Sequence, residues 1–342
     1  MTATRKPVRI AAIGCGNHAT NRVYPCFAKL EVDLVGVCDL DRGRAEANAR
    51  RFGAAAAFTD AAAMLDATRP DGVVVCAGPQ AHVAMALLAL ERRIPVYTEK
   101  PAAPTADEAW RVAQASRAAG TLAMTGFKYR YGRAMDKVMA IMAAPEFGPM
   151  KALSVVRCGG WMQNDPRDLR TQFLHDFCCH PIDMVCHVGG EIDEVYTAST
   201  APDSYAITVR FASGAVGSLL LSCRADWGRP VDRTEILGAP GHIIEIEDQI
   251  FMRYHVGTAP RASHDPRFCT AGSDSMEETG FIPEMRAFVE HCAGTRPPER
   301  IPSRIEESAR SLAVFEAIQR SAASRRPERP ARFDGASRAI GA

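Results

Sequence analysis

A stripe of acidic and imidazole side chains stands near the middle of the 342-residue chain. The segment Asp176–Asp183 has the sequence DFCCHPID, and His187 follows it. On a helix, positions 176, 180, 183 and 187 share one face, so His180 stands in line with the two carboxylates and with His187. A simple core helix does not need carboxylates and imidazoles together. The pattern therefore indicates a site at which protons are exchanged.

A lysine forms the second candidate for chemistry. The tripeptide Glu99-Lys100-Pro101 follows the strand-like run Val96–Thr98. In open α/β sheets, ligands bind outside the carboxyl ends of the strands. We therefore expect Lys100 to face a bound cofactor.

A metal site is the competing interpretation of the stripe. The same short segment contains six side chains that can bind zinc: His175, Cys178, Cys179, His180, Cys186 and His187. Helix geometry points the adjacent cysteines to different sides, and no second Cys/His cluster completes the usual set of zinc ligands. We therefore expect no metal.

A glycine turn near the N-terminus predicts a dinucleotide site. The apolar run Val8–Ile13 leads into Gly14–Ala19, which reads GCGNHA and matches G-x-G-x-x-A. The first glycine permits a tight turn, the second lets a pyrophosphate approach the backbone, and the small alanine lets the next helix pack closely. Asp39 ends the following strand-like run, where a carboxylate accepts hydrogen bonds from ribose hydroxyls.

Asp39 also bears on the choice of dinucleotide. A carboxylate repels a 2′-phosphate, and the neighbouring Leu40 offers no positive charge, so NAD is favoured. Arg42 and Arg44 are close enough in the sequence to leave NADP open.

The elements that position these groups follow two rhythms. In the first 125 residues, strand-like runs alternate with helical ones, which predicts a parallel sheet with helices on both faces. From Lys151 onward, strands follow one another, and in Tyr205–Phe211 apolar residues alternate with other residues, which predicts an antiparallel sheet. We expect a dinucleotide-binding domain over residues 1–128, an α+β domain with an open, mostly antiparallel sheet over 129–325, and a flexible tail over 326–342.

The composition excludes several classes of protein. With 41 basic and 40 acidic residues, the formal net charge is +1, which argues against a dedicated binder of nucleic acid or membrane surfaces. No apolar stretch approaches the roughly 20 residues that cross a bilayer, and the short polar N-terminus does not resemble an export signal. The 11 cysteines lack the spacing of a disulfide framework, which favours a cytoplasmic protein.

Taken together, these motifs resemble the Gfo/Idh/MocA oxidoreductases, the group of glucose–fructose oxidoreductase and inositol dehydrogenase. The resemblance extends in order over nearly all of residues 8–325 and is carried by the glycine turn, the strand end Val37–Asp39, the Glu99–Pro101 tripeptide and the segment Asp176–Asp183. It implies a Rossmann domain followed by a substrate domain.

The resemblance also implies roles for single residues. Lys100 contacts the reacting hydroxyl and stabilises its developing negative charge, His180 is the acid/base, and Asp176 orients the substrate or His180. An unperturbed histidine pKa of about 6.5 suits that task. The implied cofactor-binding residues are Gly14, Gly16, Asn17, His18, Asp39, Ala77, His82, Glu99 and Lys100. Arg130 joins Lys100, Asp176 and His180 as a substrate-binding residue.

The loop Trp161–Arg170 leads toward the candidate helix and supplies two further substrate-binding candidates. Trp161 offers a flat apolar face to a sugar ring, and Arg170 suits a carboxylate. The alternative for the loop arginines is pairing with Asp165 and Asp168 in solvent.

The sequence thus predicts an NAD(P)-dependent oxidoreductase that transfers a hydride between the nicotinamide and a secondary hydroxyl of a sugar, polyol or cyclitol. A sugar lyase or glycosidase that uses transient oxidation and a catalytically silent dinucleotide-binding regulator are the alternatives. We expect a homodimer or homotetramer that associates through the exposed face of the second domain's sheet.

Overall fold

Alternation of strands and helices in the N-terminal half produces a six-stranded parallel sheet with the order β3-β2-β1-β4-β5-β6. The computed structural model describes residues 6–160, 173, 177–200, 202–268 and 274–333. These fold into two units: unit 1 comprises residues 1–128 and 281–309, and unit 2 comprises residues 129–280 and 310–342. Each unit is described by itself.

Most residues in the strands of unit 1 are apolar and buried, as expected for a parallel sheet covered on both faces. They are β1 (Val8–Ile13), β2 (Val32–Cys38), β3 (Ala57–Phe58), β4 (Gly72–Val75), β5 (Val96–Thr98) and β6 (Ala123–Thr125). The strand order is that of a dinucleotide-binding Rossmann sheet.

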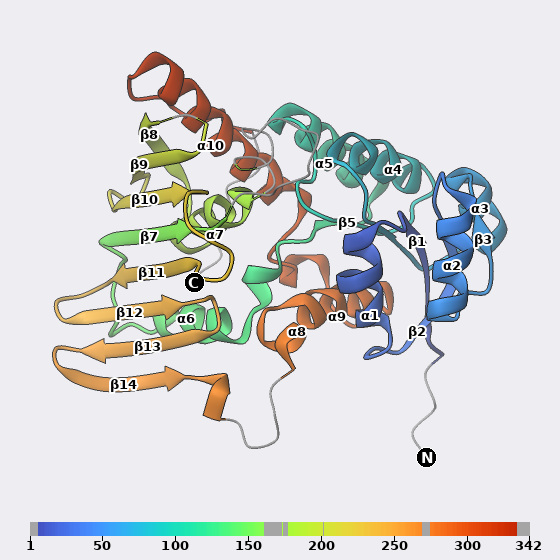
Figure 1. The fold of residues 1–342 in the computed structure, drawn as a ribbon, viewed down its shortest axis with the longest axis horizontal. Coiled ribbons are helices and arrows are strands. Elements are labelled where there is room, and N and C mark those ends of the chain that lie inside the picture. The colour runs from blue at the N-terminus through green and yellow to red at the C-terminus, as the bar shows by residue number, and fades with distance from the viewer. Residues whose placement is uncertain (1–5, 161–172, 174–176, 201, 269–273, 334–342) are drawn as a thin grey trace. The chain divides into compact units, whose positions relative to one another are not determined.

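Helices connect the strands of unit 1, and one helix of this unit comes from the C-terminal part of the chain. They are the π-helical turn Ala19–Val23, α1 (Tyr24–Phe27), α2 (Arg42–Phe52), α3 (Ala61–Thr68), α4 (Pro79–Glu91), α5 (Ala106–Ala119) and α9 (Phe281–Cys292). In Figure 1, α4 and α5 lie on one side of the sheet, and α1 and α9 lie together on the other. Residues 281–309 are part of unit 1 and not, as expected from the sequence, of the second domain.

Unit 2 is built on an eight-stranded sheet with the order β14-β13-β12-β11-β7-β10-β9-β8. Its strands are β7 (Ala152–Cys158), β8 (Ile192–Ser199), β9 (Ser204–Phe211), β10 (Val216–Ser222), β11 (Val231–Leu237), β12 (His242–Glu247), β13 (Phe251–Val256) and β14 (Ala259–His264). The strand pairs are antiparallel except β7 with β10. The predicted combination of a parallel sheet and a mostly antiparallel sheet is confirmed.

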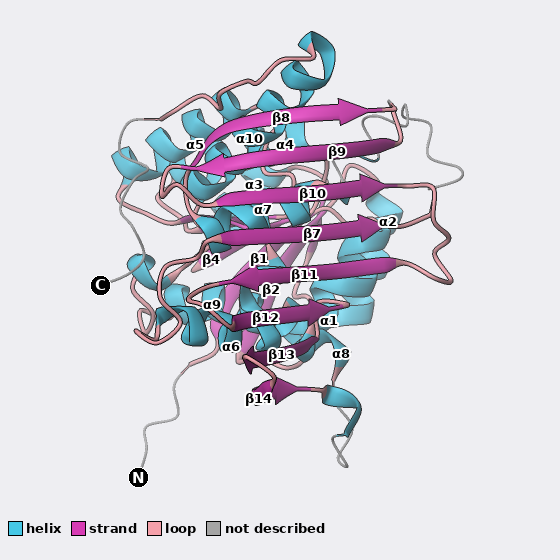
Figure 2. Cartoon of the chain, turned by 90° about the vertical axis from the view of Figure 1, so that its left-hand side faces the viewer, coloured by secondary structure: helices cyan, strands magenta, loops and turns pink. Residues whose placement is uncertain are grey.

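The helices of unit 2 are α6 (Arg133–Ala143), α7 (Cys179–Gly189) and α8 (Ser275–Glu278), and α10 (Ile305–Ser324) begins in unit 1 and continues here. A core of apolar residues from α6, α7, α10 and the sheet covers one face of the strands. Figure 2 looks onto the other face, which no helix of the described part of unit 2 covers.

The chain that follows α10 contacts the sheet of unit 2. Val195 in β8 exchanges two backbone hydrogen bonds of 2.9 Å with Glu328, and Arg332 forms ion pairs with Glu191 and Asp193. Strand β8 is the edge strand on this side of the sheet. The described residues at the start of the expected flexible tail are therefore bound to the edge of the sheet.

Candidate active site

The glycine turn after β1 has a backbone that only glycine adopts without strain. Gly14 has φ +96°, and a Cβ atom there would collide with the carbonyl oxygen of Cys76 at the end of β4. A Cβ on Gly16 would meet no atom within 4 Å, so the backbone of that residue borders open space. The turn therefore offers the close backbone approach that the pyrophosphate of a dinucleotide needs.

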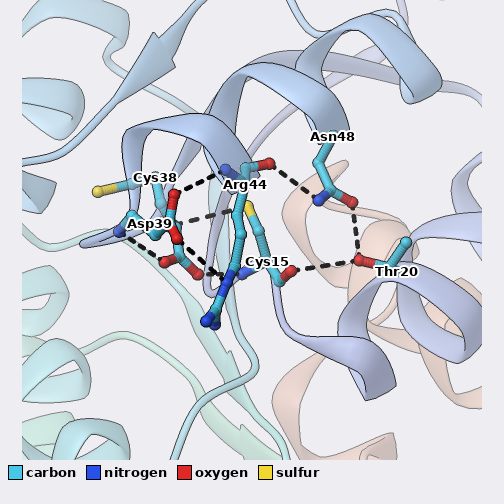
Figure 3. A network of polar contacts seen from close by, with 7 residues as sticks. Cys15, Thr20, Cys38, Asp39, Arg44 and Asn48 are labelled. Carbon is cyan, nitrogen blue, oxygen red and sulfur yellow. Dashed lines mark hydrogen bonds and ion pairs between the residues drawn. The ribbon is translucent and has the colours of Figure 1, made fainter.

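Asp39, the expected acceptor for ribose hydroxyls, also holds this turn. Its Oδ2 accepts a hydrogen bond of 2.7 Å from the backbone N–H of Cys15, and its Oδ1 accepts one of 2.9 Å from Asp41 (Figure 3). A carboxylate has about four lone-pair sites, so further acceptor capacity is left for ribose hydroxyls. The residues present thus fit NAD, while the bond to the glycine turn was not foreseen from the sequence.

His82 connects the loop after β4 to the loop that carries the candidate lysine. The ring is fully buried, its Nε2 accepts a hydrogen bond of 3.0 Å from the backbone N–H of Ala77, and its Nδ1 lies 2.8 Å from the carbonyl oxygen of Pro101. Because Ala77 donates to Nε2, the ring proton is on Nδ1 and is donated to Pro101. Burial lowers the pKa of His82, which agrees with a neutral ring. This geometry favours a role in positioning the loops.

Glu99 joins the glycine turn to Lys100. Its Oε1 lies 3.3 Å from Nε2 of His18, and its Oε2 accepts a hydrogen bond of 3.0 Å from the backbone N–H of Lys100. Burial alone would raise the pKa of Glu99, but the hydrogen bond to His18 and the nearby positive charges of His18 and Lys100 lower it overall. The buried carboxylate is therefore stabilised in its ionised form beside the candidate lysine.

In unit 2, the residues Tyr129 and Arg130 contact α7 at two points. The ring of Tyr129 lies against His180, with centroids 4.4 Å apart. Arg130 donates to both carboxylate oxygens of Asp183 at 2.7 and 2.8 Å, and its Nη1 lies 3.5 Å from Nδ1 of His187. The side chains of Arg130 and Asp183 are each 1% exposed, so this geometry favours a role for Arg130 in holding α7 over direct contact with a substrate.

The stripe on the candidate helix is therefore divided between two environments. His187 is half-buried beside the positive Arg130, and desolvation together with that charge lowers its pKa to about 3. His187 is neutral at ordinary pH and belongs to the interior of unit 2. His180 lies about two turns earlier on α7, and its ring packs against Tyr129.

A small pocket lies between the helices α6 and α7 and the strands of unit 2. Its lining residues are Tyr129, Met135, Val155, Arg157, Pro181, Met184, Asp232, Thr234, Ile246 and Gln249. Arg157 forms an ion pair with Asp232, donates to Oη of Tyr129 at 2.9 Å, and has its guanidinium over the rings of Tyr129 and Phe177. The aromatic ring that contacts His180 is thus held by a half-buried arginine from the sheet.

Three predicted site residues, Trp161, Arg170 and Asp176, lie outside the described residues, as does the rest of the loop between Trp161 and Arg170. Within the described residues, no three His, Cys, Asp or Glu side chains are grouped so that they could hold a metal ion. No helix in this part of the chain is both long and apolar enough to span a membrane.

Comparison with known families matches both halves of the chain. Residues 8–127 match the oxidoreductase family with an NAD-binding Rossmann fold, and residues 135–244 match the Gfo/Idh/MocA C-terminal domain. An inositol 2-dehydrogenase of Acidothermus cellulolyticus is 30% identical over 293 residues, which cover 81% of this chain and 84% of that protein. The chain belongs to the Gfo/Idh/MocA family of NAD-dependent oxidoreductases.

Other relatives share shorter stretches or the fold. A D-glucoside 3-dehydrogenase of Escherichia coli is 31% identical over 195 residues, and the match spans 55% of each protein. The solved structure of levoglucosan dehydrogenase with NADH and L-sorbose superposes with a TM-score of 0.83 at 20% identity, over 96% of this chain and 100% of that one. The predicted family and the predicted NAD cofactor are confirmed.

Proposed function

We propose that this protein is an NAD-dependent dehydrogenase that oxidises a secondary hydroxyl of a sugar, polyol or cyclitol. The observation that carries the proposal is the arrangement at the carboxyl edge of the unit 1 sheet, where Glu99 links His18, beside the glycine turn, to Lys100. A dinucleotide-binding turn and a lysine joined through one buried carboxylate suit an enzyme better than a silent binding protein. Relatives named for inositol and glucoside oxidation support the substrate class.

In this proposal each residue has one task. Lys100 contacts the oxygen of the reacting hydroxyl and stabilises its developing negative charge. His180 accepts the hydroxyl proton, and Asp176 orients the substrate or His180. NAD, when bound, supplies the hydride acceptor.

The remaining predicted residues serve binding. Gly14, Gly16, Asn17, His18, Asp39 and Ala77 hold the dinucleotide. We propose Trp161 as a contact for the apolar face of a sugar ring and Arg170 as a contact for an acidic group. Arg130 and His82 support this site through the hydrogen bonds that fix α7 and the Lys100 loop.

The function is tested by a screen for NAD reduction. The purified protein is incubated with NAD and, one at a time, with inositols, alkyl glucosides, levoglucosan, uronates and aminosugars, while NADH absorbance is followed. Net NADH with one oxidised product per NADH is the expected result. Turnover of a glycoside without net NADH would indicate the lyase or glycosidase mechanism instead, and tight NAD binding with no turnover would favour a regulator.

We further propose that a second copy of the chain covers the open face of the unit 2 sheet. Three apolar residues on that face, Tyr196, Val216 and Leu220, are 44%, 51% and 46% exposed. Strand register sets Leu220 between Ala206 and Val156, so apolar side chains from three strands adjoin. A soluble protein gains free energy by removing such a surface from water, and a symmetric dimer does so with one patch.

A further inference from the structure

A tyrosine lies between two buried carboxyl groups in unit 1. Oη of Tyr97, in β5, is 3.2 Å from Oε1 of Glu99 and 3.0 Å from Oε1 of Glu284 in α9. Tyr97 is fully buried, and the two glutamates are 4% and 1% exposed. A Cβ atom on Gly126 would collide with the tyrosine oxygen, so the glycine makes room for this contact.

The hydrogen bonds among Tyr97, Glu99 and Glu284 depend on how many protons these three side chains carry. A phenol has one proton and can donate it to one carboxylate. Glu99 accepts a hydrogen bond from the backbone N–H of Lys100 and faces His18, and these interactions stabilise its ionised form. Tyr97 therefore donates its hydrogen bond to the Glu99 carboxylate. The remaining short contact, between Tyr97 Oη and Glu284 Oε1, then requires a proton from Glu284.

The surroundings of Glu284 agree with a neutral acid. Its second oxygen, Oε2, is buried and has no hydrogen-bond partner within the described residues. An ionised carboxylate in that position would be a buried charge without compensation. Burial and the charge of Glu99 raise the pKa of Glu284 well above its usual range. The hydrogen bond with Tyr97 and the charge of Lys128, whose Nζ lies over the Phe281 ring, oppose this only in part.

We infer that Glu284 is a positioning residue that keeps its proton in the folded protein and donates it to Tyr97, which donates in turn to Glu99. Through this chain, α9 holds the carboxylate that fixes the Lys100 backbone and faces His18. The catalytic consequence rests on the proposed function of Lys100, whereas the protonation of Glu284 does not.

The protonation is tested by thermal unfolding of Glu284→Gln and the wild-type protein from pH 5 to pH 9. An acid whose folded pKa is raised loses stability as pH rises, because the unfolded chain ionises from about pH 4.5 while the folded one does not. Glutamine cannot ionise and still donates to Tyr97, so the Tm of the variant minus that of the wild type should increase with pH. A difference that is constant or decreases with pH would overturn the inference.

Glu290→Gln is the matched control. Glu290 is on the same helix, but its carboxylate is 38% exposed and accepts a hydrogen bond of 2.8 Å from Arg296. Its replacement should not produce a difference that rises with pH. Since no substrate is needed, the result stands whether or not the proposed dehydrogenase activity is found.

The positioning role is tested by kinetics on the substrate that the screen identifies. Glu284→Leu removes the donor and should lower kcat about tenfold with little change in KM, which is the loss expected for a hydrogen bond to a charged network. Glu284→Gln should restore most of kcat because the amide donates in place of the acid. Equal kcat for folded Leu, Gln and wild-type proteins would overturn the positioning role while leaving the protonation result intact.

Discussion

The imidazole of His180 lies against the ring of Tyr129, and the next residue, Arg130, forms a two-point ion pair with Asp183 one turn further along α7. Two consecutive residues of one short segment therefore hold the candidate acid/base and the helix that carries it. The arrangement makes the orientation of His180 depend on a charged contact that is away from solvent.

This contact predicts a large effect on stability. Asp183→Ala removes the carboxylate that neutralises the buried Arg130 guanidinium, and breaking a buried ion pair in this way costs about 3–5 kcal/mol. Denaturant unfolding should detect the loss as a lower midpoint with an unchanged slope. The double variant Arg130→Met, Asp183→Leu should recover much of the stability, since it leaves no unpaired charge. A single-variant loss below about 1 kcal/mol would contradict the importance of the pair.

His187 predicts how stability responds to acid. Its folded pKa of about 3 lies below the ordinary value near 6.5, so the unfolded chain takes up a proton first as pH falls. The neutral, half-buried ring therefore stabilises the fold above about pH 6.5, and this contribution is lost between about pH 6.5 and 3. His187→Gln, measured by thermal unfolding from pH 7 to pH 4, should show a shallower decline than the wild type. Parallel curves for the two proteins would mean that His187 is not the residue responsible.

Asp39 predicts coupled losses of cofactor affinity and stability. Asp39→Ala removes the proposed ribose acceptor and also the partner of the Cys15 N–H, so NAD affinity should fall about tenfold or more and Tm should fall with it. Calorimetric titration with NAD measures the first effect. Asp41→Ala is the control, because Asp41 caps α2 by accepting the Arg44 N–H at 3.1 Å, and it should reduce stability with little effect on NAD. Wild-type NAD affinity in Asp39→Ala would exclude the ribose contact.

Lys100 and His180 predict a separation of chemistry from binding. Lys100→Met and His180→Ala should each lower kcat by about 10²–10⁴-fold, the usual contribution of a positioned acid or base, while NAD affinity stays close to that of the wild type. Stopped-flow mixing with NAD and substrate separates the two quantities. Near-normal turnover in His180→Ala would assign the proton transfer to another group. Dialysis against a chelator should leave the wild-type rate unchanged, and a loss restored by zinc would revive the metal interpretation.

The open face of the unit 2 sheet predicts the oligomeric state. Leu220→Glu places a charge within the apolar patch and should convert the assembly to a smaller species in size-exclusion chromatography with light scattering. Leu40→Glu is the control, since Leu40 is an exposed apolar residue of unit 1 at 94% exposure, and it should leave the mass unchanged. A wild-type protein that runs as a monomer would contradict the proposal directly.

Local patterns in the sequence were sufficient for the two sheets and for the residues at the carboxyl edge of unit 1. Gly14, Asp39 and Lys100 lie just after strands β1, β2 and β5, and the apolar runs in the sequence of these strands predict them. Strands β3, β13 and β14 are not among the strands that the sequence predicts. Nearly all of β14 is exposed and it contains Pro260, so this edge strand has no apolar alternation to read. Helix α6 was also not anticipated, although its buried residues follow helical spacing.

The polar contacts that organise the site could not be read in the same way. Tyr97 and Glu284 are separated by 187 residues, and Arg130 and Asp183 by 53. Nothing in the local sequence around either partner specifies the other, because the match depends on how distant elements pack. Both contacts involve residue types that also occur at protein surfaces. The sequence therefore indicates candidate residues for buried polar contacts but not which residues pair.

The hydrogen bond between Asp39 and the glycine turn has a consequence for protein engineering. Exchanging an acidic residue at the end of the second strand is the obvious way to admit a phosphorylated ribose, yet here it would also release the backbone of the glycine turn. Leu40 is next to it and makes little contact with the fold, since 94% of its surface is exposed. Cofactor preference in this scaffold is thus more safely redesigned from a basic residue introduced at position 40 than from the carboxylate that shapes the turn.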